Sequence, residues 1–536
     1  MKLVSVDEMK AIEQEANQKG VSYEQMMERA GKGVADFIHQ WLAGSSSRVV
    51  TALVGSGNNG GDALIALDYL AQQGYDTRAF LVKKRSDSLG ERVELSGTKV
   101  ISFEEADSLK LLDIWLFESD LVIDGLLGTG FKLPLKKPYI EILNTVKSSQ
   151  GSFKVIAVDC PSGMDCDTGE VSGECVGADI TLCMQAVKKG MMTFPAFYFI
   201  GELEVIDLNL PKTLDSEKKI LNEVADRDYV RSVIPIRDLN SHKGTFGSAM
   251  IIAGSINYTG VAYLAAMGAY RVGAGLVNLA IPGSLHAALA GSLPEATWLI
   301  LPHDMGAIKA DAASLVYRNL DKVTAMLMGP GWGEEETTRD FLEKILLGKN
   351  NTPRKKSGIG FVMDDPEEND ESEFKLPPMV IDADGLKILA KLTDWEEHLP
   401  GSSVLTPHPG EMAILTGLSV AEIQKDRMNI AKKYASAWGQ VVVLKGALTV
   451  IAAPDGRTMT IPVAHPSLAK AGTGDVLAGM ITGLIAQHLD PFDSAIAGAW
   501  IHAQAGIEAT TRVGHSAAVL ASDIICSVGK IFNKLD

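Results

Sequence analysis

The feature that most constrains this fold is an alternation between apolar runs of strand length and amphipathic stretches of helix length. Residues 49–54 and 77–82 are strand-like, and a helical pattern over residues 63–72 lies between them. This order predicts a βαβ unit, and its recurrence predicts a doubly wound α/β domain on a parallel sheet. Further strand-like runs follow at residues 120–124, 154–159 and 204–208.

The chain has 536 residues, more than one hydrophobic core usually supports, so we expect two domains. Between residues 211 and 241 the chain is polar and charged, and a second alternating series then begins. We place the domains at residues 1–215 and 230–536. A charged stretch at 348–378 is interpreted as a solvated surface insertion. The expected strands of the second α/β domain are residues 248–253, 276–281, 325–328, 379–382, 403–406 and 441–444.

Composition excludes several classes of protein. The formal net charge of −17 disfavours binding to nucleic acid or to an anionic membrane, and no apolar stretch is long enough to cross a bilayer. Five cysteines without a CxxC pair argue against a disulfide framework and a zinc site. The start of the chain lacks a secretory signal, and Ser5 with Glu8 predicts a capping box that opens a helix. We expect a cytoplasmic enzyme that acts on small molecules.

A glycine-rich segment at residues 55–62, Gly-Ser-Gly-Asn-Asn-Gly-Gly-Asp, joins the first strand to its helix. Backbone N–H groups converge on an anion at such a junction, although Asn-Gly steps are also common in ordinary turns. Asp124 and Asp159 each follow an apolar strand. Because parallel strands end at one edge of a sheet, we expect Asn59 and Ser162 to lie beside these carboxylates. Such oxygen donors suit a hard cation; alternatively, the aspartates only cap loop amides.

These segments resemble the NAD(P)HX epimerases, a family that acts on hydrated NADH and NADPH. The resemblance covers residues 1 to about 210 and rests on segments 27–31, 55–62, 124–130 and 159–169. It implies a Rossmann-like domain with a potassium ion on Asn59, Asp124 and Ser162. It also implies a set of residues that contact the hydrate: Asn58, Asn59, Gly60, Gly61, Asp62, Gly128, Thr129, Gly130, Phe131, Lys132, Leu133, Pro134 and Asp159.

Epimerisation of the hydrated carbon needs a proton donor and a proton acceptor near its hydroxyl group and the ring nitrogen. A carboxylate facing a lysine can fill these roles. On the resemblance Asp159 is the carboxylate and Lys188 occupies the family's lysine position, with Lys189 as the alternative. Two features depart from the family: Ala63 replaces a glycine that usually follows the aspartate, and residues 183–188 lack its phenylalanine.

The clearest motif of the second half is residues 470–479, Lys-Ala-Gly-Thr-Gly-Asp-Val-Leu-Ala-Gly, at the start of an apolar helix expected to begin near Val476. Amides at a helix start stabilise the charge of a transferring phosphoryl group. Asp475 is placed to act as a base toward a substrate hydroxyl. The alternative is that the glycines at 472–474 only allow close helix packing.

Lys445 ends a predicted strand, and a tight turn at 454–456 predicts a hairpin of strands 449–453 and 458–462 that walls a nucleotide pocket. From about residue 239 onward the sequence is similar to the NAD(P)HX dehydratase family, which belongs to the ribokinase-like superfamily. The resemblance implies that a nucleotide phosphorylates the hydroxyl of the hydrate, after which phosphate leaves. The other segments that carry it are residues 242–247, 329–333, 381–385 and 406–411.

On this resemblance Asp475 is catalytic and Glu411 is a candidate ligand of Mg²⁺, whereas His408 outside its motif would be interpreted as a core or loop histidine whose hydrogen bonds the backbone satisfies. The fused arrangement favours ADP, with ATP as the alternative. The hydrate would contact Val261, Gly331, His408, Pro409, Gly410, Glu411, Met412, Ala413, Ile414 and Asp475. The nucleotide would contact Lys445, Gly446, Ala447, Leu448, Thr449, His465, Pro466, Ser467, Leu468, Ala469, Lys470, Ala471, Gly472, Thr473 and Gly474.

Two other functions stay open. A ribokinase-like kinase for a small molecule such as a vitamin precursor would use Asp475 in the same way. A non-enzymatic first domain is a further alternative, since related folds occur in RNA-decapping factors, although Asp159 and Lys188 together favour chemistry. A homo-oligomer is expected because ribokinase-like domains frequently assemble. The sequence does not distinguish hydrated NADH from hydrated NADPH.

Overall fold

The computed structural model describes residues 1–536 except 47, 86, 348–375 and 402. The chain forms two compact units, Met1–Val224 and Ala225–Asp536. The division falls within the polar segment 211–241. The insertion expected at 348–378 lies almost entirely outside the described residues. Within the described part of the chain, no helix is long and apolar enough to cross a membrane.

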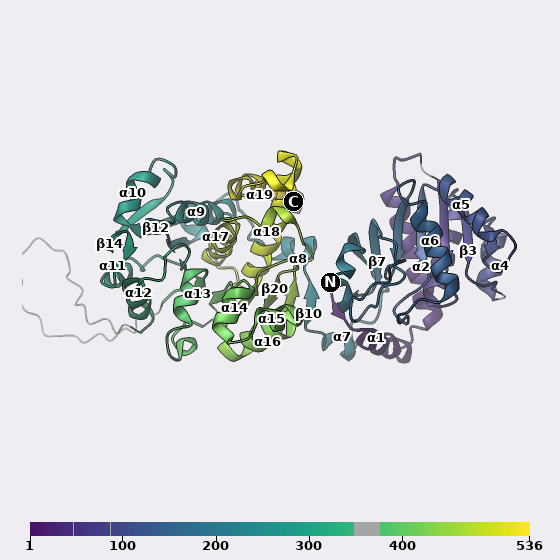
Figure 1. The fold of residues 1–536 in the computed structure, drawn as a ribbon, viewed down its shortest axis with the longest axis horizontal. Helices are drawn as coiled ribbons and strands as arrows, with labels where there is room; N and C mark the ends of the chain where they lie inside the picture. Colours follow the sequence, from purple (N-terminus) through teal and green to yellow (C-terminus); the bar gives the residue numbers. More distant parts are fainter. Residues whose placement is uncertain (47, 86, 348–375, 402) are drawn as a thin grey trace, which may run out of the picture. The chain divides into compact units, whose positions relative to one another are not determined.

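The first unit is built on a parallel sheet whose strand order reverses at the centre (Figure 1). The order is β4-β3-β2-β5-β6-β7-β9, so the chain builds one half outward from β2 and the other half outward from β5. Ligands bind in open α/β sheets at such a reversal, beyond the carboxyl ends of the strands. The predicted doubly wound α/β fold is confirmed. The strands are β2 (Val49–Val54), β3 (Asp76–Leu81), β4 (Lys99–Ser102), β5 (Leu121–Gly125), β6 (Lys154–Val158), β7 (Ile180–Met184) and β9 (Glu202–Ile206).

Six helices of the first unit are α1 (Val6–Gln18), α2 (Tyr23–Trp41), α3 (Asn58–Gln72), α4 (Ser88–Leu95), α5 (Ser108–Glu118) and α6 (Lys137–Ser148). Helix α1 begins at the predicted capping box, in which the Ser5 hydroxyl accepts a hydrogen bond from the Glu8 amide and the Glu8 carboxylate accepts one from the Ser5 amide. Just before it, the short strand β1 (Leu3–Val4) pairs with β8 (Val187–Lys188). This pairing brings α1 beside Lys188.

Helix α3 begins five residues earlier than the sequence pattern predicts. Residues 58–62, expected as a loop, form its first turns, and Gly57 is the N-cap. The reason is a close approach of backbones that only glycine permits. A Cβ atom at Gly60 would lie 2.0 Å from the carbonyl oxygen of Gly55, and one at Gly55 would lie 1.9 Å from that of Leu126. The start of α3 is therefore held against the loop that follows β5.

The second unit has a larger sheet in which the strands run in the order β21-β20-β19-β18-β17-β16-β11-β12-β13. All neighbours from β19 to β13 are parallel, whereas β19, β20 and β21 pair antiparallel, which confirms the predicted hairpin. The strands are β11 (Ser248–Ile252), β12 (Leu276–Pro282), β13 (Thr297–Leu301), β16 (Ala325–Met328), β17 (Met379–Ile381), β18 (Val404–Leu405), β19 (Val441–Leu444), β20 (Val450–Ala452) and β21 (Thr458–Thr460).

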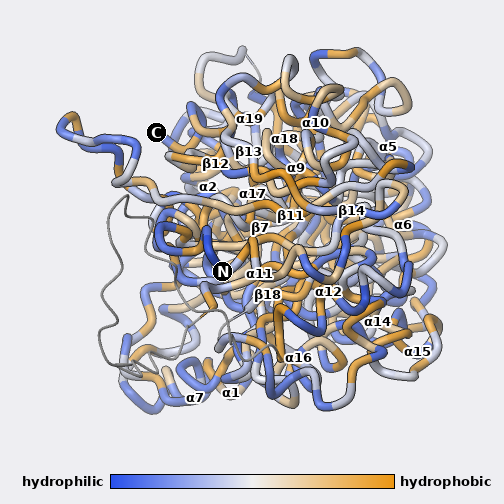
Figure 2. Tube along the Cα trace, turned by 90° about the vertical axis from the view of Figure 1, so that its left-hand side faces the viewer, coloured by the Kyte–Doolittle hydropathy of each residue, from blue (hydrophilic) through white to orange (hydrophobic). Residues whose placement is uncertain are grey.

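Helices that position the site of this unit are α9 (Val261–Arg271), α13 (Asp384–Leu389), α14 (Pro409–Thr416), α16 (Arg427–Trp438), α17 (Thr473–Ala486), α18 (Pro491–Val513) and α19 (Ala521–Leu535). Helix α17 starts at Thr473 rather than near Val476, because Gly472 adopts the left-handed conformation (φ 88°) that turns the chain into the helix. The amides of residues 473–475 therefore belong to its first turn. In Figure 2 the apolar colour runs along β11 and α17.

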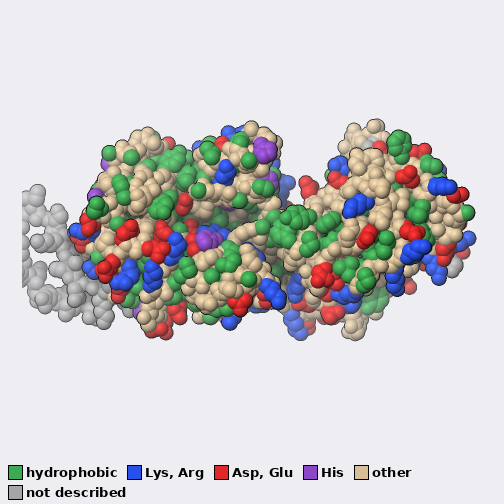
Figure 3. Space-filling model, in the orientation of Figure 1, with side chains coloured by type: hydrophobic (Ala, Val, Ile, Leu, Met, Phe, Trp, Pro, Cys, Tyr) green, Lys and Arg blue, Asp and Glu red, His purple; other side chains and the backbone are tan. Residues whose placement is uncertain are grey.

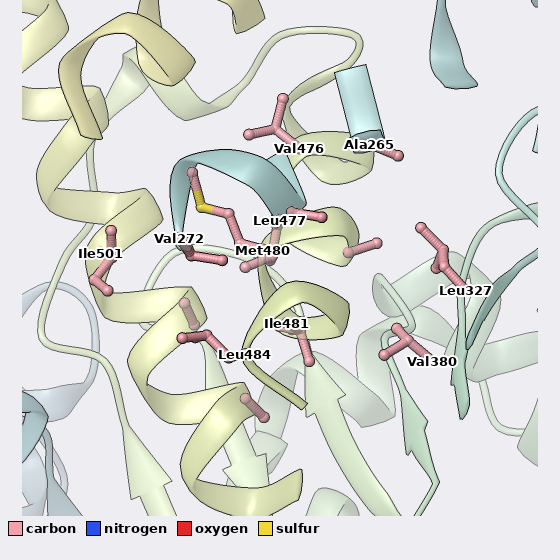
Figure 4. Close-up of a cluster of buried hydrophobic side chains, with 14 of the residues drawn as sticks. Ala265, Val272, Leu327, Val380, Val476, Leu477, Met480, Ile481, Leu484 and Ile501 are labelled. Atoms are coloured by element: carbon pink, nitrogen blue, oxygen red, sulfur yellow. The ribbon is translucent and has the colours of Figure 1, made fainter. Parts of the chain in front are cut away.

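Helix α17 is buried along almost its whole length and packs closely on α9 (Figure 4). Figure 4 shows Val476, Met480 and Leu484 from α17 within a cluster that also receives Ala265 and Val272 from the α9 segment. Glycines line the contact, since a Cβ atom at Gly479 would lie 2.0 Å from the carbonyl oxygen of Ala265. The backbones of α9 and α17 are therefore in direct contact, and this contact fixes the distance between the two helices.

Replacing Gly479 by Ala is expected to lower the free energy of unfolding of the second unit by about 1–3 kcal/mol, because the added methyl group overlaps the backbone of α9. Gly529→Ala on α19 is the matched control, since a Cβ atom there meets nothing within 4 Å and alanine favours helix. Thermal unfolding of the full chain compares the two variants. Equal melting temperatures would contradict the close contact.

Two candidate active sites

The first candidate site lies where the sheet of the first unit reverses. Asp124 at the end of β5 is 2% exposed, and its Oδ2 atom accepts a hydrogen bond from the Ser162 amide (2.7 Å). Its Oδ1 atom accepts from the Ser162 hydroxyl (2.6 Å) and the Leu126 amide (3.3 Å). Burial raises the pKa of Asp124, and the hydrogen bonds from Ser162 partly offset this effect. Asp124 therefore accepts hydrogen bonds from loop amides, as the alternative interpretation expected. It also lies beside Ser162, as the cation-site interpretation expected.

Asn59 lies in the same cluster. Its Nδ2 atom donates to the carbonyl oxygens of Leu127 (2.9 Å) and Val158 (2.8 Å), while the Leu127 amide donates to the Ser162 hydroxyl (2.9 Å). Within the described part of the chain, Asp124 has no ion-pair partner and the Asn59 Oδ1 atom accepts no hydrogen bond. A buried carboxylate with neutral oxygen donors fits a monovalent cation. The described residues contain no cluster of three or more His, Cys, Asp or Glu side chains that could hold a metal ion.

Asp159 follows β6 and pairs with Lys188. Its backbone is left-handed (φ 63°), and its Oδ1 atom accepts hydrogen bonds from the Met184 amide (3.0 Å) and from the Lys188 ammonium group. Lys188 is fully buried and also donates to the carbonyl oxygens of Met184 (3.3 Å) and Ala186 (3.0 Å). Burial alone lowers the pKa of Lys188, but Asp159 outweighs it, so the pKa is raised. Lys189 instead pairs with Glu8 at 2.8 Å.

The expected hydrate loop at residues 128–134 starts at this site. A Cβ atom at Gly128 would meet the Cβ atom of Asn59 at 3.2 Å, so the loop begins against α3. Further along, Lys132 is largely exposed and pairs with Asp165 at 3.0 Å. The sequence did not single out Glu13 on α1, whose pKa is raised by burial and by the nearby charge of Asp159. No local signal could have found it, because α1 reaches the site through the pairing of two-residue strands.

The second candidate site surrounds the start of α17. The Lys445 ammonium group lies 2.5 Å from the Oδ1 atom of Asp382 and 3.7 Å from the Oε2 atom of Glu411. A Cβ atom at Gly474 would lie 3.8 Å from the Lys445 Nζ atom, so this cation reaches the helix start. Burial alone lowers the pKa of Lys445, but Asp382 and Glu411 raise it overall. The chain thus places a buried cation beside the amides of the first turn of α17.

Asp475 on that turn is mostly buried. Burial and the nearby charge of Asp382 raise the pKa of Asp475 to about 7, while Lys445 opposes this rise. A carboxyl group with such a pKa is suited to accept a proton near neutral pH. Asp382 was not among the expected site residues, although its motif at 381–385 was noted; it is 1% exposed and accepts a hydrogen bond from the Thr406 hydroxyl (2.7 Å).

The expected hydrate residues come together only in part. His408 caps α14 by accepting hydrogen bonds from the amides of Gly410 (3.0 Å) and Glu411 (3.2 Å), and its Nε2 atom lies 3.3 Å from the Glu411 carboxylate. Burial raises the pKa of Glu411. Val261 and Gly331 are neighbours, since a Cβ atom at Gly331 would meet that of Val261 at 3.2 Å. Within α14, Met412 is fully buried in the core, whereas Ile414 is exposed.

The expected nucleotide residues lie in two segments, of which the second runs into the first turn of α17. In the first, residues 445–449, the Gly446 amide donates to the Thr449 hydroxyl (3.3 Å). The second segment is residues 465–474. There the Thr473 hydroxyl donates to the carbonyl oxygen of Lys470 (2.9 Å), and the buried Ser467 hydroxyl donates to that of Gly506 (3.0 Å). Figure 3 shows a hollow in the face of this unit, with acidic, basic and histidine side chains at its margin.

Each unit thus carries a buried carboxylate and lysine pair beyond the carboxyl ends of a parallel sheet, next to the first turn of a glycine-rich helix. These features are those of a two-domain α/β enzyme whose candidate sites lie at the carboxyl ends of its parallel sheets. Comparisons agree with this class. Residues 249–530 match the family described as NAD(P)H-hydrate dehydratase, and residues 23–190 match the family described as YjeF-related protein N-terminus.

The chain is 34% identical over 519 residues to the bifunctional NAD(P)H-hydrate repair enzyme Nnr of Moorella thermoacetica, covering 95% of this chain and 92% of that one. The enzyme of the same name from Coxiella burnetii is 30% identical over 521 residues, with 96% of each chain covered. The chain therefore belongs to the family of bifunctional NAD(P)H-hydrate repair enzymes. It is also similar to the solved ADP/ATP-dependent NAD(P)H-hydrate dehydratase from Bacillus subtilis, co-crystallised with ATP and Mg²⁺ (30% identity, 59% of this chain and 99% of that chain, TM-score 0.48).

Proposed function

We propose that the protein repairs hydrated NADH and NADPH in two steps. The first unit interconverts the R and S hydrates, and the second unit dehydrates the S hydrate to NAD(P)H in a reaction that consumes an adenosine nucleotide. The observation that carries this proposal is that one chain of this family holds two charged centres: Asp159 paired with Lys188 in one unit, and Asp475 near Lys445, which pairs with Asp382, in the other. Two such centres at sheet edges where ligands bind favour chemistry over a scaffold.

In dehydration, Asp475 accepts the proton of the substrate hydroxyl as its oxygen takes a phosphoryl group from the nucleotide. The amides of residues 473–475 and the Lys445 cation stabilise the negative charge that develops on that group. Phosphate then leaves with the C–O electron pair, and loss of a ring proton restores the double bond. ADP is the phosphoryl donor that the fused arrangement favours, with ATP as the alternative.

Mg²⁺, when bound, neutralises charge on the nucleotide phosphates. We assign Glu411 to it because this buried carboxylate and that of Asp382 both lie beside the Lys445 ammonium group, at 3.7 and 2.5 Å, and hard oxygen donors suit the ion. The hydrate is assigned to the side of Val261, Gly331 and His408. The nucleotide is assigned to the two segments at residues 445–449 and 465–474.

In epimerisation, Asp159 accepts a hydrogen bond from the substrate and takes up a proton as the new C–O bond forms, while Lys188 holds its carboxylate in place. K⁺ is assigned to Asn59, Asp124 and Ser162, where it would brace the two loops that follow β5 and β6. The hydrate is assigned to residues 58–62 and 128–134.

The resemblance to ribokinase-like proteins is the support for a homo-oligomer, and the five free cysteines support a reducing cytoplasm.

The test supplies mixed hydrate epimers with ADP or ATP, Mg²⁺ and K⁺, and follows the absorbance of reduced nicotinamide. Complete recovery is expected, in a fast phase from the S hydrate and a second phase from the R hydrate. Recovery of only one epimer's share would show that the first unit is inactive. Nucleotide turnover without recovery would instead favour the alternative, a ribokinase-like kinase of another small molecule that also uses Asp475.

A further inference from the structure

Two more carboxyl groups lie at the first site and have no part in the proton transfers described so far: Asp62 is assigned only to contact with the hydrate, and Glu13 has no assignment. Asp62 on α3 is 7% exposed, and Glu13 on α1 is partly buried. Asn59, in the first turn of α3, donates to the carbonyl oxygen of Val158 (2.8 Å), the residue before Asp159, and Val4 pairs with Lys188 directly before α1. Both helices therefore meet the Asp159–Lys188 pair, and the charges of that pair act on Asp62 and on Glu13. Within the described part of the chain, neither Asp62 nor Glu13 makes an ion pair or a side-chain hydrogen bond.

The cluster is assembled from four separate elements. Asp62 comes from the first turns of α3, Asp159 from the end of β6 and Lys188 from β8, while Glu13 arrives because Val4 pairs with Lys188 directly before α1. Lys10 of the same helix also acts on Glu13 and lowers its pKa. The Cys183 thiol nearby stays neutral, since burial raises its pKa to about 12.

Lys188 is unsuited to exchange protons with a substrate. Its three ammonium hydrogens are matched by three acceptors: the Asp159 carboxylate and the carbonyl oxygens of Met184 and Ala186. Its pKa is raised, as described above. It therefore acts as a fixed cation, and the acid of the reaction has to be another group.

The charge balance of the cluster identifies that group. Three carboxyl groups share one ammonium group, so full ionisation would leave two unpaired negative charges in a largely buried site. Burial raises the pKa of Asp62 well above its usual value, and repulsion from Asp159 and Glu13 adds to the rise. Burial and Asp159 also raise the pKa of Glu13. Full ionisation of the cluster is therefore disfavoured, and the pKa of Asp62 is raised more than that of Glu13.

We propose that Asp62 is the acid of the epimerase reaction and that Glu13 is a positioning residue that keeps the proton on it. This inference rests on the epimerase function proposed above. The proton passes from Asp62 to the hydroxyl oxygen of the hydrated carbon, and the C–O bond breaks with its electron pair leaving on water. The ring-nitrogen lone pair then forms a C=N bond. Water adds to the opposite face, the C=N pair returns to nitrogen, and the proton released by water returns to Asp62 through Asp159.

The test starts from one purified epimer without nucleotide, so that the second unit is idle, and follows formation of the other epimer by chromatography across pH. The wild-type rate is expected to fall as pH rises and Asp62 loses its proton. Glu13→Gln removes one repelling charge, so this alkaline fall moves to lower pH by about one unit. Asp62→Asn lowers the rate by about 100-fold. Glu24→Gln, an exposed carboxylate of α2, leaves the profile unchanged.

A Glu13→Gln profile that superimposes on that of the wild type would overturn the role of Glu13. Infrared difference spectra between wild type and Asp62→Asn give a readout independent of turnover: a carboxylic-acid band at neutral pH is expected in the wild type alone, and its absence would overturn the role of Asp62. Glu13→Asp is expected to bring the alkaline fall back toward its wild-type position. Failure of the wild type to interconvert epimers would contradict the proposed function itself, whatever the state of these carboxyl groups.

Discussion

Replacing Asp475 by Asn is expected to slow nucleotide-dependent dehydration by about 10²–10⁴-fold, because the carboxylate that accepts the hydroxyl proton is lost while the helix start stays intact. Its raised pKa, about 7, also fixes the pH dependence. The active form is the ionised one, so the dehydration rate of the wild type should fall as pH drops below about 7 and level off above it. Epimer interconversion, which uses the other unit, should be unaffected.

Recovery of reduced nicotinamide from the purified S hydrate measures this rate. Asp394→Asn is the matched control, because Asp394 is an exposed aspartate of the same unit with a left-handed backbone that asparagine tolerates. It should retain the wild-type rate and pH profile. A dehydration rate of Asp475→Asn within a few-fold of the wild type would rule out this carboxylate as the base.

Replacing Lys188 by Met is expected to destabilise the first unit by about 3–5 kcal/mol, since it leaves the Asp159 carboxylate buried without its cation. Epimer interconversion should be lost as well. The next residue offers an internal comparison. Lys189 pairs with Glu8 where both side chains are about one-third exposed, so Lys189→Met should change stability by only about 0–1 kcal/mol.

Denaturant unfolding of the full chain, followed through the transition of the first unit, compares the two lysines. The double variant Lys188→Met with Asp159→Asn should recover part of the lost stability, because it removes the uncompensated charge as well as its partner. If Lys188→Met and Lys189→Met unfold alike, the buried pair does not support the site in the manner described.

Much of this architecture could be predicted from the sequence because parallel sheets bury their strands on both faces. The runs 49–54, 325–328 and 441–444 correspond to β2, β16 and β19 residue for residue. Strand β13 did not stand out, since Thr297, Trp298 and Leu299 leave side chains partly exposed at an edge of the sheet. The starts of α3 and α17 were placed late, because glycines usually mark loops and here permit backbone contact instead.

The sites were predictable where their residues follow strands. Asp124, Asp159 and Lys445 all lie at the ends of apolar runs, so their convergence follows from the common direction of the strands. Residues that arrive by tertiary packing were not predictable in this way. Glu13 depends on the pairing of β1 with β8, and the contact of Asp382 with Lys445 depends on the register of strands 63 residues apart in the chain.

The close packing of α9 and α17 bears on the distance between the two binding sites of the second unit. The two helices run side by side from the same end, since a Cβ atom at Gly472 would touch Leu264 and one at Gly483 would touch Ala269. Helix α9 begins at Val261, which is assigned to the hydrate, and α17 begins at Thr473, which is assigned to the nucleotide. Because the backbones of the two helices are in direct contact, the distance between the two assigned binding sites is fixed by the fold. The phosphoryl group is therefore transferred over a distance that is set before either ligand binds.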